Sequence, residues 1–366
     1  MPGGRHGYFC ETATDHLSCL SITVNIRLPA EWEAQSAILL TWPHPATDWQ
    51  PWLDEVEPVY IEITRQICPH EKIIIACHDQ THKTHIKSLL SQQGLPVDKY
   101  RLYIAPSNDS WARDHGPVSV MAGQQPRLLD FTFNGWGNKY PADLDNRITT
   151  TLYKAGAFGK TPCQGIDFIL EGGSIETDGQ GTLMTTVSCL LSKHRNPGLG
   201  KKEIEAKLSE FLGADNIIWI HHGQLAGDDT DGHIDTLARF ANDETILYVT
   251  SNESDDPNFA SLNRMEEELQ GLTKKNGKPY KLVSLPSPVI TNAEGNYLPA
   301  SYANFLIINH AVLVPVYGLE TDAGVIKIFK ECFVNRKIIP VNCRPLIQQY
   351  GSLHCITMHL PQGVVS

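Results

Sequence analysis

Short apolar runs recur along the chain, and they constrain its fold more than any other feature of the sequence. Most are about four to six residues long and rich in Ile, Val and Leu, a pattern typical of strands buried in a sheet. They lie at 37–42, 72–77, 102–105, 128–133, 182–186, 216–220, 245–250, 305–309, 312–316 and 337–341. The runs therefore predict a set of short, buried strands.

Helical patterns lie between several of these runs, so the predicted class is mixed α/β. Apolar residues recur there at three- and four-residue intervals. The segments concerned are 56–68, 81–93, 201–212, 258–272 and 323–333, and Gly213 predicts the end of the third helix. Runs and helices alternate at roughly regular spacing. This order predicts a repeated ββα-type unit, although the units share no sequence identity.

The composition is that of a globular protein with a sizeable core. The chain has 366 residues, of which 41% are hydrophobic, and a formal net charge of −11. An acidic balance argues against nucleic acid as the main partner and suits a small cationic one. No run approaches the roughly 20 apolar residues that a membrane-spanning helix needs, so we expect no membrane partner.

Cysteine usage and the N-terminal segment bear on location and domain limits. The 9 cysteines form no C-x-x-C pair, which predicts neither a zinc knuckle nor a disulfide framework. We therefore expect a reducing, cytoplasmic setting. Residues 1–27 are Gly-rich and polar and lack the apolar stretch of a signal peptide. They are predicted to be an extension outside the fold, with 28–366 forming a single domain.

Two acidic motifs follow predicted strands. Asp114 lies in a loop at 108–117 that ends at Gly-Pro, and its carboxylate could accept paired N–H bonds from a guanidinium group. The alternative is a surface ion pair with Arg113. Glu171 precedes Gly172 and Gly173, which let the backbone turn sharply. This glutamate either orients and charges a histidine or simply ends a strand.

A third motif, at 227–235, places four carboxylates and a histidine within nine residues. Such a density of charge binds an organic cation or a metal ion, or else forms a solvated loop. His233 and Asp235 alternate along an extended segment and could ligate a metal from one face. Because no second ligand motif completes the set, a metal is the weaker interpretation.

Cys355 stands apart from the other cysteines. It follows His354 and a Gly351-Ser352 turn that would expose the thiol. A histidinium beside it would lower its pKa, as a nucleophile requires. The alternative is a buried, inert thiol.

Together these motifs resemble those of the agmatine deiminase family, part of the guanidino-group-modifying superfamily that includes the bacterial-type peptidylarginine deiminases. The resemblance runs from about residue 28 to 360 and is carried also by the segments 29–33, 133–137, 299–305 and 351–357. It implies a pentein fold, which is a five-bladed α/β propeller of ββαβ-type repeats around an acidic pocket. It also implies hydrolysis of agmatine to N-carbamoylputrescine and ammonia, with no metal and no other cofactor.

The resemblance implies a role for each motif residue. Cys355 would attack the guanidinium carbon to give a covalent amidino-cysteine. His233 would protonate the departing ammonia and then activate water, with Glu171 holding this histidine in its protonated form. Asp114 and Asp235 would bind the guanidinium nitrogens.

The chain departs from the family pattern around the outer part of the site. Residues 349–353 read Gln-Tyr-Gly-Ser-Leu where many members have Gly-Gly-Gly-Asn-Ile, Asp231 replaces a common Asn, and Asn138 a common Gly. These changes concern the pocket beyond the guanidinium. For agmatine, that pocket is predicted to be lined by Trp111 and Trp136, with Asp228 or Asp229 meeting the distal amine. Core packing is the alternative for the two tryptophans.

Other functions stay open at this point. Deimination of peptidyl or free arginine is the alternative on the same fold. A metal-dependent hydrolase that uses His233 and the aspartates, and a non-catalytic polyamine binder, are less consistent with Cys355, His233 and Glu171 occurring together. The sequence leaves open whether the protein is a homo-oligomer.

Overall fold

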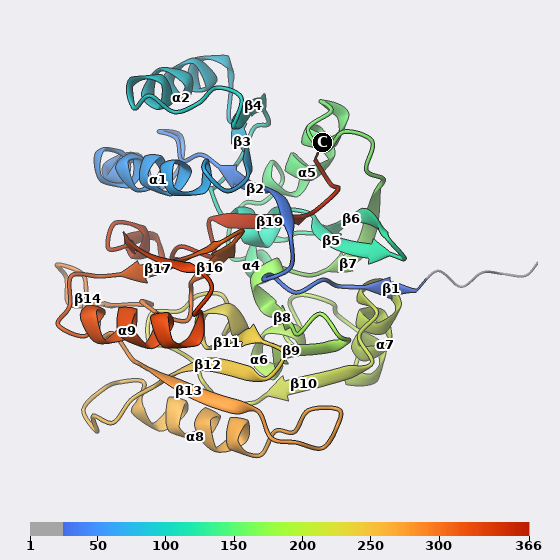
Figure 1. The fold of residues 1–366 in the computed structure, drawn as a ribbon, viewed down its shortest axis with the longest axis vertical. Coiled ribbons are helices and arrows are strands. Elements are labelled where there is room, and N and C mark those ends of the chain that lie inside the picture. The colour runs from blue at the N-terminus through green and yellow to red at the C-terminus, as the bar shows by residue number, and fades with distance from the viewer. Residues whose placement is uncertain (1–24, 366) are drawn as a thin grey trace, which may run out of the picture.

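Five of the sheets share one topology in the computed structural model, which describes residues 25–365 (Figure 1). In each sheet an antiparallel pair of strands is followed by a helix and then by a third strand parallel to the second. The predicted strand and helix alternation therefore corresponds to a repeated ββαβ unit. The chain is mixed α/β, as expected.

The strands of the five sheets are short. In order along each sheet, they are β19 (Thr357–Pro361), β2 (Gln35–Thr41), β3 (Lys72–Cys77) and β4 (Tyr100–Ile104); β1 (Ile26–Arg27), β5 (Val118–Ala122), β6 (Gln125–Thr132) and β7 (Cys163–Ile169); β10 (Asn216–Ile220), β9 (Thr182–Thr186) and β8 (Ile175–Thr177); β11 (Ala238–Asn242), β12 (Thr245–Thr250) and β13 (Lys281–Pro286); β16 (Leu306–Ile308), β17 (Ala311–Val316) and β18 (Lys337–Asn342). A sixth, two-stranded sheet pairs β14 (Ile290–Thr291) with β15 (Tyr297–Leu298).

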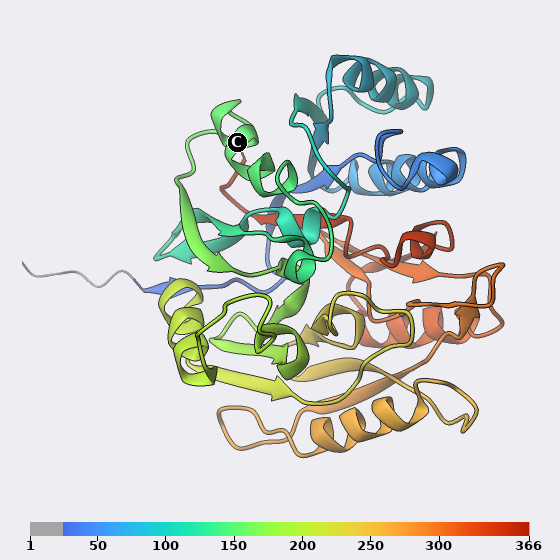
Figure 2. The ribbon, with the colours of Figure 1, turned by 180° about the vertical axis from the view of Figure 1, so that it is seen from behind.

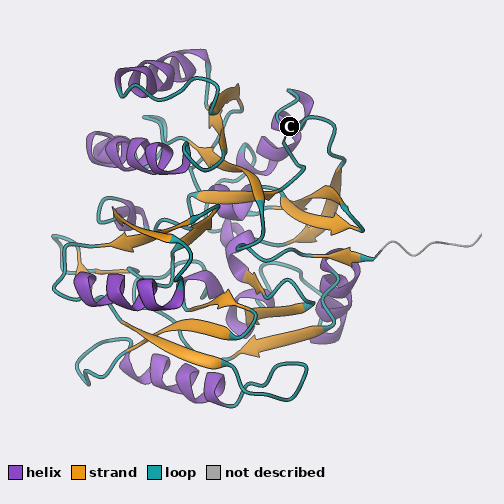
Figure 3. Ribbon diagram, in the orientation of Figure 1, coloured by secondary structure: helices purple, strands orange, loops and turns teal. Residues whose placement is uncertain are grey.

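In each ββαβ unit one helix connects the second and third strands of the unit. These strand pairs are β2 and β3, β6 and β7, β9 and β10, β12 and β13, and β17 and β18. These helices are α1 (Leu53–Ile67), α5 (Ile148–Lys154), α7 (Lys201–Leu212), α8 (Phe259–Gln270) and α9 (Asp322–Cys332). The remaining helices are α2 (Gln80–Gln92) and the single turns α3 (Ala112–His115), α4 (Gly135–Asn138) and α6 (Val187–Leu190). The longer helices lie at the periphery and the strands nearer the centre (Figures 2 and 3).

Helix α7 illustrates how local sequence sets these boundaries. Ile204, Leu208 and Leu212 recur every four residues and are buried on one face. At the N-terminus the Glu203 side chain accepts a hydrogen bond from the Gly200 N–H at 3.1 Å. At the C-terminus Gly213 takes the left-handed conformation, with φ of 68°. The predicted helix at 201–212 is thus confirmed at both ends.

The two ends of the described chain are held by strand pairing. The C-terminal strand β19 pairs with β2, and β1 pairs with β5. Because Ile26 and Arg27 are in β1, the fold begins two residues before the expected boundary at Leu28. The rest of the predicted extension, residues 1–24, lies outside the described residues.

Two further sequence expectations bear on the chain outside the site. The seven cysteines among residues 25–365 are all free thiols. Over the same residues, no helix combines the length and the apolar character that crossing a bilayer requires.

Strand β19 should be integral to the fold because Leu360 is fully buried on it. Replacing Leu360 with Ala removes buried methyl groups and leaves a cavity, so we expect a loss of about 2–5 kcal/mol in the free energy of unfolding in urea. Val334→Ala, at a position that is 77% exposed, is the control and should change this free energy by less than about 0.5 kcal/mol. A Leu360→Ala protein as stable as the control would contradict the burial of β19.

Candidate active site

The motif residues come from equivalent places in the repeated unit. Each lies in the connection that leads into the first strand of one ββαβ unit. Asp114 precedes β5, Glu171 precedes β8, His233 and Asp235 precede β11, and Cys355 precedes β19. Asn304, which the sequence did not single out, precedes β16 in the same way. The repeat therefore brings together residues that are far apart in the sequence.

Gly173 marks the point where three of these side chains converge. A Cβ atom at this position would lie 2.6 Å from His233 Nδ1, 2.8 Å from Asp114 Oδ1 and 3.2 Å from Asp235 Oδ2. The first two distances are below those that real Cβ atoms show, so only glycine fits here. Glycine at position 173 thus allows these side chains to approach the backbone closely.

Asp114 is held in place by two donors. Its Oδ2 accepts a hydrogen bond from Trp136 Nε1 at 2.9 Å, and its Oδ1 accepts one from the Gly173 N–H at 3.1 Å. His233 Nδ1 lies 3.5 Å from Oδ1. Burial raises the pKa of Asp114 to about 6, although the nearby His233 opposes this shift.

Asp235 uses only one of its carboxylate oxygens. Its Oδ2 lies 2.7 Å from His354 Nδ1, whereas Oδ1 is buried without a hydrogen-bond partner. Burial alone would raise the pKa of Asp235, but His354 and His233 outweigh burial and hold this pKa below its ordinary value. Asp235 therefore keeps one buried carboxylate oxygen that makes no hydrogen bond within the protein.

His233 is buried and has one ring nitrogen, Nε2, without a hydrogen-bond partner. Burial acts to lower its pKa, yet Asp114, Cys189 and Glu171 raise this pKa well above the ordinary value. Because its cationic form persists near neutral pH, His233 can donate a proton.

Glu171 acts on His233 through its charge rather than through a direct hydrogen bond. Both of its carboxylate oxygens lie 3.0 Å from Arg195 Nε, and Arg195 Nη1 in turn bonds Asp231 Oδ2 at 2.6 Å. Arg195 was not among the residues that the motifs indicated. Its signal was weak, since it is a single arginine after α6 with no acidic neighbour in the sequence.

Glu171, Cys189 and His233 are the one group among residues 25–365 whose geometry suits a metal ion. Their potential ligand atoms lie within 4.8 Å of one another, and all three residues are buried. The carboxylate of Glu171 is, however, committed to Arg195 on both oxygens.

Cys355 lies against Asn304, whose Oδ1 is 3.4 Å from Sγ. Its expected activation by His354 is wrong, because the His354 ring is turned to Asp235 and Glu31. Burial, with Asp235 and Asp114 adding to it, raises the pKa of Cys355 well above its ordinary value. The thiol of the ligand-free protein is therefore protonated.

A pocket opens above the Cys355 thiol, and four aspartates give it an acidic lining. It is lined by Asp48, Asp109, Asp114 and Asp229, by Trp111, Trp136, Tyr140 and Tyr350, and by Thr230, Gln349, Gly351 and Cys355. Among the described residues that line it there is no Lys, Arg or His. The lining thus favours a cation.

The structure brings some of the predicted outer-pocket residues to this cavity but not all of them. Trp111, Trp136 and Asp229 line it, and the Asp229 carboxylate accepts a hydrogen bond from Tyr140 Oη at 2.8 Å. Asp228 does not line it. Its carboxylate instead accepts hydrogen bonds from the N–H groups of Thr230 and Gly232 and stabilises its own loop.

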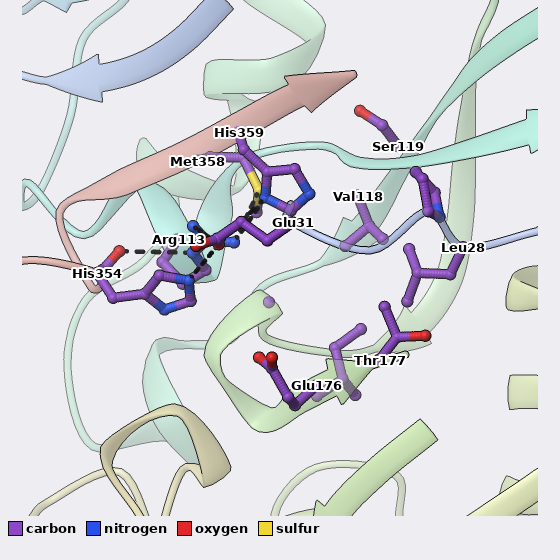
Figure 4. Close-up of a pocket in the computed structure, with 13 residues that line it drawn as sticks. Leu28, Glu31, Arg113, Val118, Ser119, Glu176, Thr177, His354, Met358 and His359 are labelled. Carbon is purple, nitrogen blue, oxygen red and sulfur yellow. Dashed lines mark hydrogen bonds and ion pairs between the residues drawn. The ribbon is translucent and has the colours of Figure 1, made fainter. Parts of the chain in front are cut away.

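Figure 4 shows a second, smaller pocket, which His354 helps to line. It is lined in part by Glu31, Arg113, Glu176 and His354. Arg113 donates to Glu31 Oε2 at 3.2 Å, which replaces the surface pairing with Asp114 considered from the sequence. Glu31 and Glu176 were missed because neither stands in an acidic cluster.

Comparison with known proteins agrees with this geometry. Residues 27–361 match the model of the Porphyromonas-type peptidyl-arginine deiminase family. A Selenomonas ruminantium protein named "Putative agmatine deiminase" is 32% identical over 357 residues, covering 91% of this chain and 95% of that protein.

Two solved structures are similar over nearly the whole chain. One is of the "Putative Arginine Deiminase" from Porphyromonas gingivalis, with 45% identity, a TM-score of 0.87, and coverage of 93% of this chain and 100% of that one. The other is a Cys-to-Ser variant of C. jejuni agmatine deiminase with substrate bound, with 36% identity, a TM-score of 0.85, and coverage of 92% and 97%. With a family model matched from residue 27 to residue 361, the chain belongs to the Porphyromonas-type peptidyl-arginine deiminase family.

Proposed function

We propose that this protein is an agmatine deiminase, which hydrolyses agmatine to N-carbamoylputrescine and ammonia. The observation that carries the proposal is the Cys355 thiol, which lines an acidic pocket together with Asp114, while Asp235 and His233 converge with Asp114 at Gly173. A guanidinium ion is planar and cationic, and paired carboxylates are its usual partners in proteins. The proposal is also supported by the agmatine deiminases among the similar proteins.

In the first half of the reaction, the guanidinium is held by Asp114 and by the unpartnered Oδ1 of Asp235. The Cys355 thiolate attacks the guanidinium carbon and forms an S–C bond. The protonated His233 gives its proton to one nitrogen, the C–N bond breaks, and ammonia leaves. The products of this half are a cationic amidino-cysteine and a neutral His233.

In the second half, His233 takes a proton from water as the water oxygen adds to the same carbon. The C–S bond then breaks, Cys355 leaves as a thiolate, and the urea product loses a proton. His233 is again protonated at the end of the cycle. His233 Nδ1 lies 3.5 Å from Asp114 Oδ1, on the side of Asp114 and Asp235, which supports a role for His233 in both transfers.

Substrate binding has a second effect in this mechanism. Two carboxylates and burial disfavour the thiolate in the free protein. A bound guanidinium places a positive charge beside both carboxylates, so it lowers the pKa of Cys355, and the thiol gives its proton to solvent to form the nucleophile. The cation thereby supplies what the sequence had assigned to a neighbouring histidinium.

The outer pocket supports agmatine over free arginine. Agmatine carries an amine where arginine has an α-carboxylate, and the pocket offers acids but no basic side chain among the described residues that line it. Arg113 and Arg239, which could have met a carboxylate, are buried in ion pairs with Glu31. We infer that Asp229 receives the distal amine and that Trp111 and Trp136 contact the alkyl chain.

We infer further that the five ββαβ sheets are the blades of an α/β propeller of the pentein type. The supporting observation is that all five place a site residue in the connection entering their first strand. In a propeller such connections meet near the central axis.

Substrate preference tests the proposal directly. We expect ammonia release from agmatine with a kcat/KM at least about 100-fold above that for free arginine, because the arginine carboxylate would lie among acids without a partner. A blocked arginine peptide should also be a poor substrate. The measurement compares all three with and without a chelator, and chelator-sensitive activity would favour the metal-dependent alternative. A preference for arginine or the peptide would contradict agmatine as the substrate.

Cys355→Ser should lower ammonia release from agmatine by at least about a thousandfold with the fold intact, because the hydroxyl is a far weaker nucleophile. In the unchanged protein, acid quenching during turnover should trap an added amidine group on the Cys355 peptide in mass spectra. Cys163→Ser is the matched control, since Cys163 is half-buried on β7 away from the pocket. Comparable activity in the two variants would rule out Cys355 as the nucleophile.

The raised pKa of Cys355 predicts how its reactivity depends on pH. Alkylation of the free protein by iodoacetamide, followed on the Cys355 peptide, should still rise at about pH 9, by about tenfold per pH unit. Asp114→Asn removes one of the negative charges that raise this pKa, so its alkylation should be faster at about pH 8. Asp243→Asn, on an exposed turn, should leave the rate unchanged. A plateau below pH 8 in the unchanged protein would refute the raised pKa.

A further inference from the structure

His354 lies between two buried carboxylates that belong to opposite sides of the site. Its Nδ1 is 2.7 Å from Asp235 Oδ2, and its Nε2 is 2.7 Å from Glu31 Oε2. Figure 4 shows this ring reaching toward Glu31 from the loop that precedes the strand carrying His359. The histidine that precedes the nucleophile thus connects Asp235 to Glu31, which lines the second pocket.

The two carboxylates that face the His354 ring are both ionised. The pKa of Asp235 is held below its ordinary value, so this carboxylate is ionised and can only accept. The same holds for Glu31, because Arg239, His354 and Arg113 overcome the effect of burial and lower its pKa well below the ordinary value. Each ring nitrogen of His354 therefore lies at hydrogen-bond distance from an oxygen of an ionised carboxylate.

The far end of this chain of hydrogen bonds is rigidly held. Glu31 Oε1 accepts a hydrogen bond from the Ile307 N–H at 2.7 Å and lies 3.0 Å from Arg239 Nη2. Its Oε2 accepts a further bond from Arg113 Nη2 at 3.2 Å. The backbone N–H of His354 is also fixed, by Asn304 Oδ1 at 2.8 Å. The ring consequently has one orientation available to it.

This arrangement sets the orientation of Asp235. Because Oδ2 is bound to His354, the carboxylate cannot rotate, and Oδ1 remains the buried oxygen without a partner. His354 also lowers the pKa of Asp235, which keeps this carboxylate ionised close to Asp114, where mutual repulsion would otherwise favour protonation of one of the pair. Both effects prepare Asp235 for a cation.

We propose that His354 and Glu31 are positioning residues for the reaction, which hold Asp235 so that its free oxygen faces the guanidinium group of the substrate. The inference rests on the proposed function and adds two residues to it. Neither residue touches the reacting atoms, since Glu31 acts through His354 and His354 acts through Asp235. Their contribution belongs to substrate binding more than to the chemical step.

Several charged groups surround this pair and enter any dependence on pH. Asp235 is faced by His354, His233, Arg239, Asp114 and Cys355, whereas His354 is faced by Asp235, Glu31, Glu176 and His359.

The test replaces His354 with Phe, which keeps a ring but has no donor, and with Gln, which keeps donors of shorter reach. For His354→Phe we expect the KM for agmatine to rise by about 10- to 100-fold, with a smaller change in kcat, because the clamp binds the cation before and during the reaction. His354→Gln should fall between this variant and the unchanged protein. The acid limb of the kcat/KM profile should move to higher pH by about one unit in His354→Phe, since Asp235 loses a partner that lowers its pKa.

His85→Phe is the matched control. His85 lies on α2 with its side chain about half exposed, and its Nε2 contacts the Glu57 carboxylate at 2.8 Å. It should keep the KM and the acid limb of the unchanged protein. Thermal unfolding verifies that each variant is folded, and His354→Gln carries the test should His354→Phe fail to fold.

A folded His354 variant with the KM and acid limb of the unchanged protein would overturn the positioning proposal. If the unchanged protein released no ammonia from agmatine, the proposed function itself would fail. The same assay therefore distinguishes the two failures.

Discussion

A set of buried charges of both signs at the centre of the sheets underlies the rest of the structure. Glu31 is paired there with Arg113, Arg239 and His354, and Arg239 also binds Glu176. An unpaired charge in such a place would cost several kcal/mol, so each of these residues depends on the others being present. The connections that carry the site residues are held in register by this network.

The site differs from this network because its negative charges are not all paired with positive ones. Around the Cys355 thiol the negative charges of Asp114 and Asp235 are only partly balanced, and one oxygen of Asp235 has no partner. The negative charge around the thiol therefore suits a cationic substrate. In the proposed mechanism the substrate supplies the positive charge and, by doing so, activates the nucleophile.

The strands predicted from the sequence and those missed differ in what they bury. The middle strands β9, β12 and β17 are buried along nearly their whole length and carry no charged residue, so their runs were readily recognised. The first strands β8 and β11 are short and carry Glu176 and Arg239 inward to the charged network. A charged residue in a strand usually indicates a position on the surface. These strands therefore lack the continuous apolar run that predicts a buried strand.

Helix limits were predictable for a local reason. The end of α7 at Gly213 depends on a residue that favours the left-handed conformation, and the sequence displays that residue directly. No equivalent signal exists for a contact such as Arg195 with Glu171, which joins residues from different connections of the fold.

The sequence by itself determined the mixed α/β class, the approximate positions of ten strands and five helices, the family, and the residues Asp114, Glu171, His233, Asp235 and Cys355 as candidates. These follow from local patterns, because periodicity, glycines and clustered acids act within a few residues. Only the tertiary structure decided which carboxylates face the pocket. Asp229 lines it while its neighbour Asp228 stabilises a turn, and His354 faces two carboxylates instead of the thiol beside it. Adjacent residues can have different roles because the direction and the charge partners of each side chain depend on segments that are distant in the chain.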